Sequence, residues 1–139
     1  MQVDTILSFG GHSEAAIRFY TEALGAEVIV MMRWKDSPDP ALRTVSPDPD
    51  KIMHASFRIG ETTLMASDGV ETQSQPDIRG VTLSIEARDE AEAKRLFVAL
   101  SDGGKVQMPL TRTFWSSLSG MVTDRFGLAW MVNVASTTP

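Results

Sequence analysis

The sequence predicts an α+β fold built from two tandem modules, each running strand, helix, strand, loop and hairpin. Three observations predict it. The same order of apolar strand-like runs and one amphipathic helix occurs twice within 139 residues. Each copy ends in a hairpin whose turn contains a glycine, Gly60 or Gly127. Each half alone would leave one sheet face uncovered, so we expect a curved mixed sheet, an open cup with the helices outside.

We treat residues 1–139 as a single domain, with module one at about 1–70 and module two at about 79–135. The elements expected in module one are a strand at 3–9, a helix at 14–24, a strand at 27–35, a loop at 36–50, and a hairpin of strands at 52–59 and 62–67. Ser13 is placed to cap the helix, which Gly25 ends. The loop contains four prolines and is therefore expected to be irregular and exposed.

The elements expected in module two are a strand at 80–86, a helix capped by Asp89 and ended by Gly103 and Gly104, a strand at 105–110, a loop at 111–117, and a hairpin of strands at 119–123 and 128–134. Asp89 and Glu92 have the spacing of a capping box at the start of the helix. Residues 128–132 contain no polar side chain, which predicts a strand buried on both faces or lining an apolar cavity.

The composition excludes several classes of function. A net charge of −5 and a pI near 4.9 provide no basic field, so we expect neither a nucleic-acid partner nor an anionic membrane surface. No apolar run approaches roughly 20 residues and the N-terminus does not resemble a signal peptide, which predicts a cytoplasmic protein. The absence of cysteine excludes disulfides, thiolate ligands and a cysteine nucleophile. Eight methionines are many for this length, and we favour core filling over a ligand-moulding wall.

One candidate for acid–base chemistry is His54. It alternates with apolar residues along strand 52–59, in phase with Ser56 and Arg58, so the three polar side chains should face the cup or solvent. Imidazole exchanges protons near neutral pH, and His54 could therefore hold or protonate an oxyanionic ligand. The alternative is a partly buried histidine bonded to a backbone carbonyl.

Aromatic residues in the two loops are candidates for ligand stacking. Phe114 and Trp115 lie in loop 111–117, and Trp34 lies beside the proline-rich loop. The alternative is a hydrophobic plug or a dimer contact, which we favour for Trp34 and not for Trp115. Trp130 is expected in the core.

Three charged residues are assigned no chemistry. Asp124 and Arg125 are expected to pair locally in a turn, where an exposed ion pair contributes little. Asp68 is expected to be solvated at the end of its strand.

A series of short motifs runs through nearly the whole chain outside the proline-rich loop. They are Leu7-Ser8-Phe9-Gly10-Gly11, Glu14-Ala15-Ala16-Ile17-Arg18-Phe19-Tyr20, Leu24-Gly25-Ala26-Glu27-Val28, Met53-His54-Ala55, Gly103-Gly104-Lys105-Val106, Met108-Pro109-Leu110, Phe114-Trp115, Gly120-Met121-Val122-Thr123-Asp124-Arg125-Phe126-Gly127 and Trp130-Met131-Val132-Asn133. In this order they resemble the PhnB-like family, some of whose members carry the label 3-demethylubiquinone-9 3-methyltransferase. That family is part of the vicinal-oxygen-chelate superfamily of glyoxalases, bleomycin-resistance proteins and extradiol dioxygenases.

The resemblance implies a cup in which superfamily enzymes hold a divalent metal with His, Glu or Gln from three strands. Matched by strand phase, these positions fall on Asp4 or Thr5, on Gly80 and on Met131. Asp4 alone suits a hard cation, so we expect no metal site of the usual kind. No glycine-rich strand-to-helix turn with a following acidic residue suits adenosylmethionine, and we expect no cofactor.

The leading prediction is a protein that binds a small organic molecule in an apolar, aromatic-lined cup. The expected ligand contacts are Trp34, Ser56, Arg58, Phe114, Trp115, Met121 and Met131, with His54 as the candidate catalytic residue. The alternative is a metal-dependent or His54-dependent enzyme of the lyase, isomerase or dioxygenase type. Many relatives pair, and an open sheet edge remains, so a homodimer is expected.

Overall fold

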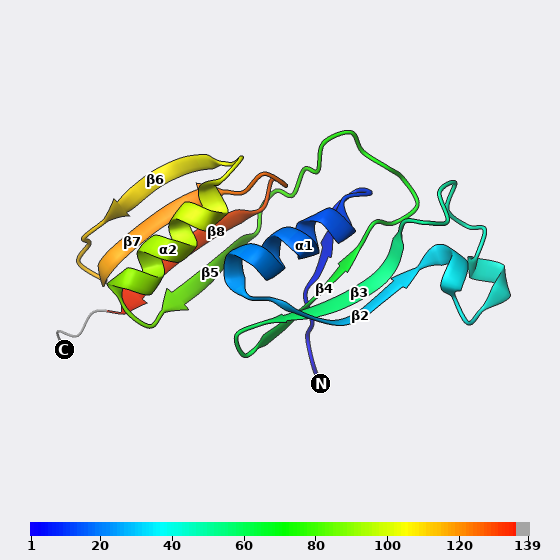
Figure 1. Ribbon diagram of the computed structural model, residues 1–139, viewed down its shortest axis with the longest axis horizontal. Coiled ribbons are helices and arrows are strands. Elements are labelled where there is room, and N and C mark those ends of the chain that lie inside the picture. The colour runs from blue at the N-terminus through cyan, green and yellow to red at the C-terminus, as the bar shows by residue number, and fades with distance from the viewer. Residues whose placement is uncertain (136–139) are drawn as a thin grey trace. The chain divides into compact units, whose positions relative to one another are not determined.

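The computed structural model describes residues 1–135 and confirms two βαβββ modules (Figure 1). The chain divides into two compact units, Met1–Asp77 and Ile78–Pro139. Each unit contains a four-stranded mixed sheet and one longer helix that packs on one face of that sheet. We call the opposite face of each sheet its open face.

The first unit consists of β1 (Ile6–Ser8), α1 (Ser13–Leu24), β2 (Glu27–Arg33), the 3-10 helices η1 (Trp34–Asp36) and η2 (Pro40–Leu42), β3 (Ile52–Ile59) and β4 (Thr62–Ser67). The strand order is β1-β4-β3-β2, and β1 runs parallel to β4. Its core is aromatic: the ring of Tyr20 lies 6.2 Å from that of Phe9 and stacks at 6.2 Å on Phe57. Burying large rings is the main source of stability in a sheet of this size.

The N-terminus of α1 differs from the prediction. Ser13 is the first helical residue, not its cap, and the His12 side chain at the cap position makes no capping bond. Within residues 1–135 the buried hydroxyl of Ser13 finds no hydrogen-bond partner. Asp68, predicted to be solvated, is instead buried and accepts the backbone N–H of Ser13. A carboxylate from a distant strand end has taken the place of a local cap.

The proline-rich segment is more ordered than predicted. It contains η2, and η1 ends β2 two residues earlier than expected. Trp34 turns into the unit, is buried, and donates its indole N–H to the carbonyl oxygen of Gly69 at 3.2 Å. Burial of a large ring with a satisfied N–H fixes where the segment begins.

The second unit consists of β5 (Thr82–Ala87), α2 (Glu90–Ser101), β6 (Lys105–Thr111), β7 (Ser116–Thr123) and β8 (Ala129–Ala135). The strand order is β5-β8-β7-β6, with β5 parallel to β8. The predicted cap is confirmed, because Asp89 accepts the N–H of Glu92 at 2.8 Å. A Cβ on Gly120 in β7 would lie 2.9 Å from the ring of Phe97, so glycine allows α2 to approach the sheet.

Strand β8 alternates between two environments, which corrects the prediction of burial on both faces. Trp130, Val132 and Val134 are buried, whereas Met131 and Asn133 are only half-buried on the open face. Strand β7 begins at Ser116, earlier than predicted, because the hydroxyl of Ser116 accepts the N–H of Val134 and extends the pairing with β8. The alternation therefore leaves polar and thioether groups accessible.

The methionines are not core filler, which is a second correction. None of the seven strand methionines is fully buried: Met31, Met32, Met53, Met65, Met108, Met121 and Met131 are all half-buried. In the second unit Met121 lies between Met108 on β6 and Met131 on β8 in the strand register. Flexible thioethers on an open face suit a surface that adapts to what it contacts.

Candidate functional site

The predicted site residues divide between the two units. Trp34, His54, Ser56 and Arg58 belong to the first unit, and Phe114, Trp115, Met121 and Met131 belong to the second.

On β3 the predicted strand phase is confirmed. Ala55 and Phe57 are fully buried, whereas His54, Ser56 and Arg58 lie on the opposite face. His54 is half-buried and, within residues 1–135, makes no hydrogen bond or ion pair. Arg58 is engaged at the exposed edge with Glu27 at 2.6 Å. His54 is therefore available to a ligand, and Arg58 is held by a neighbouring strand.

The aromatic pair of the second unit lies on the short connection between β6 and β7. Trp115 is 49% exposed and Phe114 is 94% exposed, and their rings meet edge-on at 4.8 Å. The N–H of Ser116 is bonded to the hydroxyl of Thr113, which closes the connection into a tight turn. Two adjacent rings on a short turn form a preorganised apolar contact at low entropic cost.

A pocket of about 340 Å³ lies beside this aromatic pair, entirely within the second unit. Its lining residues come from β5, the start of β7 and the end of β8: Ser84, Glu86, Trp115, Ser116, Asn133, Val134 and Ala135. Only Trp115 among them was a predicted contact. The polar members Ser84, Glu86 and Asn133 were missed, although the alternation of polar and apolar residues along β5 was a usable signal.

A hydrogen-bond chain crosses three strands next to this pocket. The hydroxyl of Ser119 on β7 donates to Oδ1 of Asn133 at 2.6 Å, and Nδ2 of Asn133 donates to the hydroxyl of Ser84 at 3.2 Å. These bonds fix the orientation of the amide between its neighbours. Glu86 lies two residues after Ser84 on β5, on the same face of the sheet. In the part of the chain that the structure describes, it has no ion pair or hydrogen bond.

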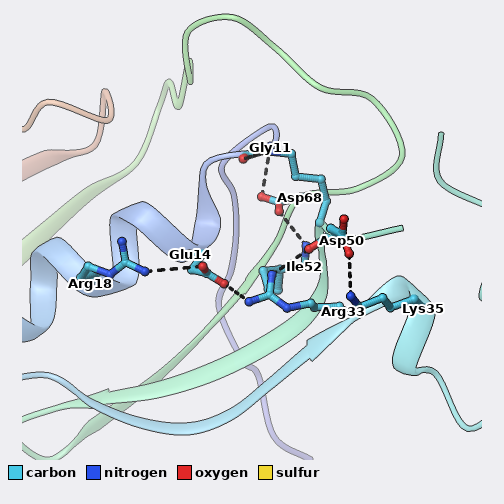
Figure 2. Close-up of polar contacts among 9 residues, drawn as sticks. Gly11, Glu14, Arg18, Arg33, Lys35, Asp50, Ile52 and Asp68 are labelled. Atoms are coloured by element: carbon cyan, nitrogen blue, oxygen red, sulfur yellow. Dashed lines mark hydrogen bonds and ion pairs between the residues drawn. The ribbon is translucent and has the colours of Figure 1, made fainter. Parts of the chain in front are cut away.

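A second polar cluster lies in the first unit, where charged side chains connect α1, β2 and the end of the proline-rich segment (Figure 2). Glu14 pairs with both Arg18 and Arg33, and Arg33 donates to the backbone oxygen of Asp50 at 2.8 Å. Lys35 pairs with the carboxylate of Asp50 at 2.7 Å. The hydrogen bond and the attraction between these two groups lower the pKa of Asp50 and raise the pKa of Lys35.

This charged cluster has a structural role. Its acids and bases are largely matched to one another, and Lys51 donates to the carbonyl oxygen of Gly11 at 2.9 Å. The pocket that it borders measures only about 190 Å³. The cluster anchors the end of the proline-rich segment to the start of α1.

The residues present do not fit the divalent metal that the superfamily fold implies. Within residues 1–135, no group of three or more histidine and acidic side chains is placed to hold an ion. The assignment of Gly80 is corrected, because β5 begins at Thr82 and places Ser84 and Glu86 on the open face. One carboxylate beside an amide and a thioether is too few oxygen ligands for a hard cation.

Neither helix of the described chain, at residues 13–24 or 90–101, has the length and apolar character needed to cross a bilayer.

Known proteins match this chain over nearly its full length. A sequence profile of the Glyoxalase/Bleomycin resistance protein/Dioxygenase superfamily matches residues 2–132. Protein YjdN of Escherichia coli (strain K12) is 33% identical over 146 residues, covering 100% of this chain and 99% of that protein. The crystal structure of protein PA1353 from Pseudomonas aeruginosa has 43% identity and a TM-score of 0.83, covering 97% of this chain and 98% of that one.

A PhnB protein from Bacillus cereus has the same fold, with 24% identity and a TM-score of 0.79 over 97% of this chain and 100% of that one. The superfamily that the sequence resembles is thus confirmed. The chain belongs to the glyoxalase/bleomycin resistance protein/dioxygenase superfamily, and within it the chain is PhnB-like.

Proposed function

We propose that this protein binds a small organic molecule on the open face of its second unit and needs no metal to do so. The observation that carries the proposal is the half-exposed indole of Trp115 in the wall of the 340 Å³ pocket. An indole that is exposed to water at a concave surface, and not packed in the core, gains contact area when a ligand covers it.

Two neighbouring features support this proposal. The amide of Asn133 is oriented by Ser84 and Ser119, so the pocket presents fixed polar groups without first having to order them. Met121 and Met131 lie beside each other on the same open face and can adapt to the shape of a ligand. A rigid ring, an oriented amide and adaptable thioethers are the parts of a selective binding surface.

Replacing Trp115 with alanine should weaken ligand binding about tenfold while the melting temperature stays unchanged. A stacked indole contributes about 0.5–1.5 kcal/mol in addition to the burial of its apolar area, and its side chain contributes little to folding where it is exposed. Screening of aromatic fragments by saturation-transfer NMR, followed by calorimetric titration of the best fragment, measures the effect. Val98→Ala is the matched control, because Val98 is exposed on α2 in the same unit. Equal affinity in both variants would refute the proposal.

A second candidate function is supported by His54, whose half-buried imidazole has no bonding partner within residues 1–135. In that case the protein is a lyase, isomerase or dioxygenase-type enzyme in which His54 exchanges a proton with the substrate. His54→Gln keeps a polar side chain of similar reach and should abolish turnover if this holds. Under the binding function it should leave the fragment affinity of the second unit unchanged.

We further propose that the protein acts as a homodimer. Strand β2 forms an edge of its sheet and exposes Val28, Ile29 and Val30, which is the kind of edge that a second chain covers. Analytical ultracentrifugation at micromolar concentration measures the mass; a monomer at all concentrations would contradict the proposal.

A further inference from the structure

We propose that the pocket of the second unit selects organic cations: a substituted ammonium or amidinium group carried on a small aromatic or apolar body. This inference rests on the binding function proposed above and names the chemical class of the ligand. Glu86 supplies the counter-charge, and Trp115 supplies the aromatic face on which the cation rests.

The charge of the pocket comes from a single residue. Glu86 is the one ionisable side chain among the lining residues, and it forms no ion pair or hydrogen bond anywhere in residues 1–135. Among the other strand and helix glutamates of the described chain, Glu14, Glu27, Glu90 and Glu92 each pair with an arginine, whereas Glu22 on α1 is unpaired but does not line this pocket. A carboxylate without a partner in a concave site repels anions and attracts a cation.

The aromatic residue strengthens the same preference. Trp115 and Glu86 line the same pocket, and the indole is half-exposed. The negative face of an indole attracts ammonium and guanidinium-type groups, and tryptophan does so better than other rings. An ion that meets both groups at once is favoured over a neutral molecule of the same shape.

The remaining polar groups of the pocket are neutral and already oriented. Oδ1 of Asn133 is occupied by Ser119, and its Nδ2 is turned to Ser84. These groups do not carry charge, so Glu86 alone determines which charge is selected. A volume of about 340 Å³ accommodates one ring with a short charged substituent.

The test compares four probes that share one ring and differ in charge: benzyltrimethylammonium, benzylamine, benzyl alcohol and benzoate. Each is titrated into the full chain at low salt while the indole ¹H–¹⁵N signals are recorded, with the Trp115 signal assigned from Trp115→Phe. We expect both cations to shift the Trp115 signal and to bind at least tenfold more tightly than benzyl alcohol, with benzoate weakest. Cation affinity should fall as salt is added, because screening weakens the attraction to Glu86.

The decisive variant is Glu86→Gln, which removes the charge and keeps the shape of the side chain. It should weaken cation binding about tenfold and leave benzyl alcohol unchanged. Glu61→Gln is the matched control, because it makes the same change in net charge at the exposed β3–β4 turn, where it lines none of the pocket.

The outcomes separate the two proposals. If benzyl alcohol and the cations bind Trp115 equally and Glu86→Gln has no effect, cation selection is overturned and the binding function stands. If Glu61→Gln weakens cation binding as much as Glu86→Gln, the attraction belongs to the overall negative charge and the pocket assignment is overturned. If no probe shifts the Trp115 signal and the fragment screen also finds no ligand, the binding function itself fails.

Discussion

Asp68→Ala should destabilise the first unit by about 3–5 kcal/mol. The Asp68 carboxylate accepts three backbone N–H groups from two separate segments. Oδ1 accepts from Gly11 at 3.0 Å and from Ser13 at 2.9 Å, and Oδ2 accepts from Ile52 at 2.8 Å. Figure 2 shows Asp68 between Gly11 and Ile52. Alanine would leave these donors without their protein partner at a site where the Asp68 side chain is buried.

The charge of Asp68 adds to this effect. Two of its three donors lie at or next to the N-terminus of α1, where the helix dipole favours a negative charge. The third donor begins β3, so one side chain connects the start of the helix to the strand that carries His54. Loss of Asp68 should therefore loosen the helix and the strand together.

Urea unfolding monitored by circular dichroism, with hydrogen exchange of individual amides, measures this loss. Amides of α1 and β3 should exchange faster, while amides of β7 and β8 in the other unit serve as an internal reference. Asp68→Asn should lose about half as much stability as Asp68→Ala. Its side-chain oxygen can accept the N–H groups of Gly11 and Ser13, but its NH2 group would face the N–H of Ile52, where both are donors. Ser13→Ala should be neutral or slightly stabilising, since its buried hydroxyl has no partner within residues 1–135. Unchanged exchange in Asp68→Ala would contradict this account.

Asp124→Ala should destabilise the second unit by a similar amount, about 3–4 kcal/mol. Asp124 was predicted to pair locally with Arg125 in an exposed turn, but it is buried. Its Oδ1 accepts the N–H groups of Phe126 at 2.8 Å and Leu128 at 3.1 Å. Its Oδ2 accepts the indole N–H of Trp130 at 2.9 Å, so the turn is bonded to the core as well as to itself.

A double-mutant cycle isolates the bond from Asp124 to the indole. Asp124→Asn can keep the two turn bonds but places an amide against the N–H of Trp130, whereas Trp130→Phe removes that N–H. The cost of Asp124→Asn should therefore fall by about 1–2 kcal/mol in the Trp130→Phe background. Hydrogen exchange of amides in β7 and β8 measures this difference in cost, and amides of α1 and β3 in the first unit serve as the reference. Strictly additive costs would show that the indole bond contributes nothing.

The two aspartates show where local sequence patterns stop being informative. Asp68 is separated from Gly11 by 57 positions and from Ser13 by 55, and nothing in its neighbours indicates these partners. The cap of α2 was predicted correctly because Asp89 and its partner Glu92 are three residues apart. Capping within a few residues leaves a sequence signal, and capping by a distant carboxylate does not.

The sequence by itself determined the order of the elements, the phase of β3 and the superfamily. These properties depend on hydrophobic periodicity, turn glycines and motif order, all of which are local or nearly local along the chain. It also predicted Trp115 and Met131 as ligand contacts, because an aromatic residue in a loop and an apolar strand can be recognised without knowing their neighbours; Trp115 lines the pocket, and ligand contact by either residue stays a prediction.

Only the tertiary structure decided which groups share a pocket. Glu86 and Asn133 are partners across the parallel β5–β8 register, and Trp115 reaches the same pocket from the connection before β7. The tertiary structure also decided that the methionines lie on half-open surfaces and that Trp34 is buried. Strand pairing and helix placement determine these neighbours through space, and periodicity along one strand contains no information about the strand that lies beside it.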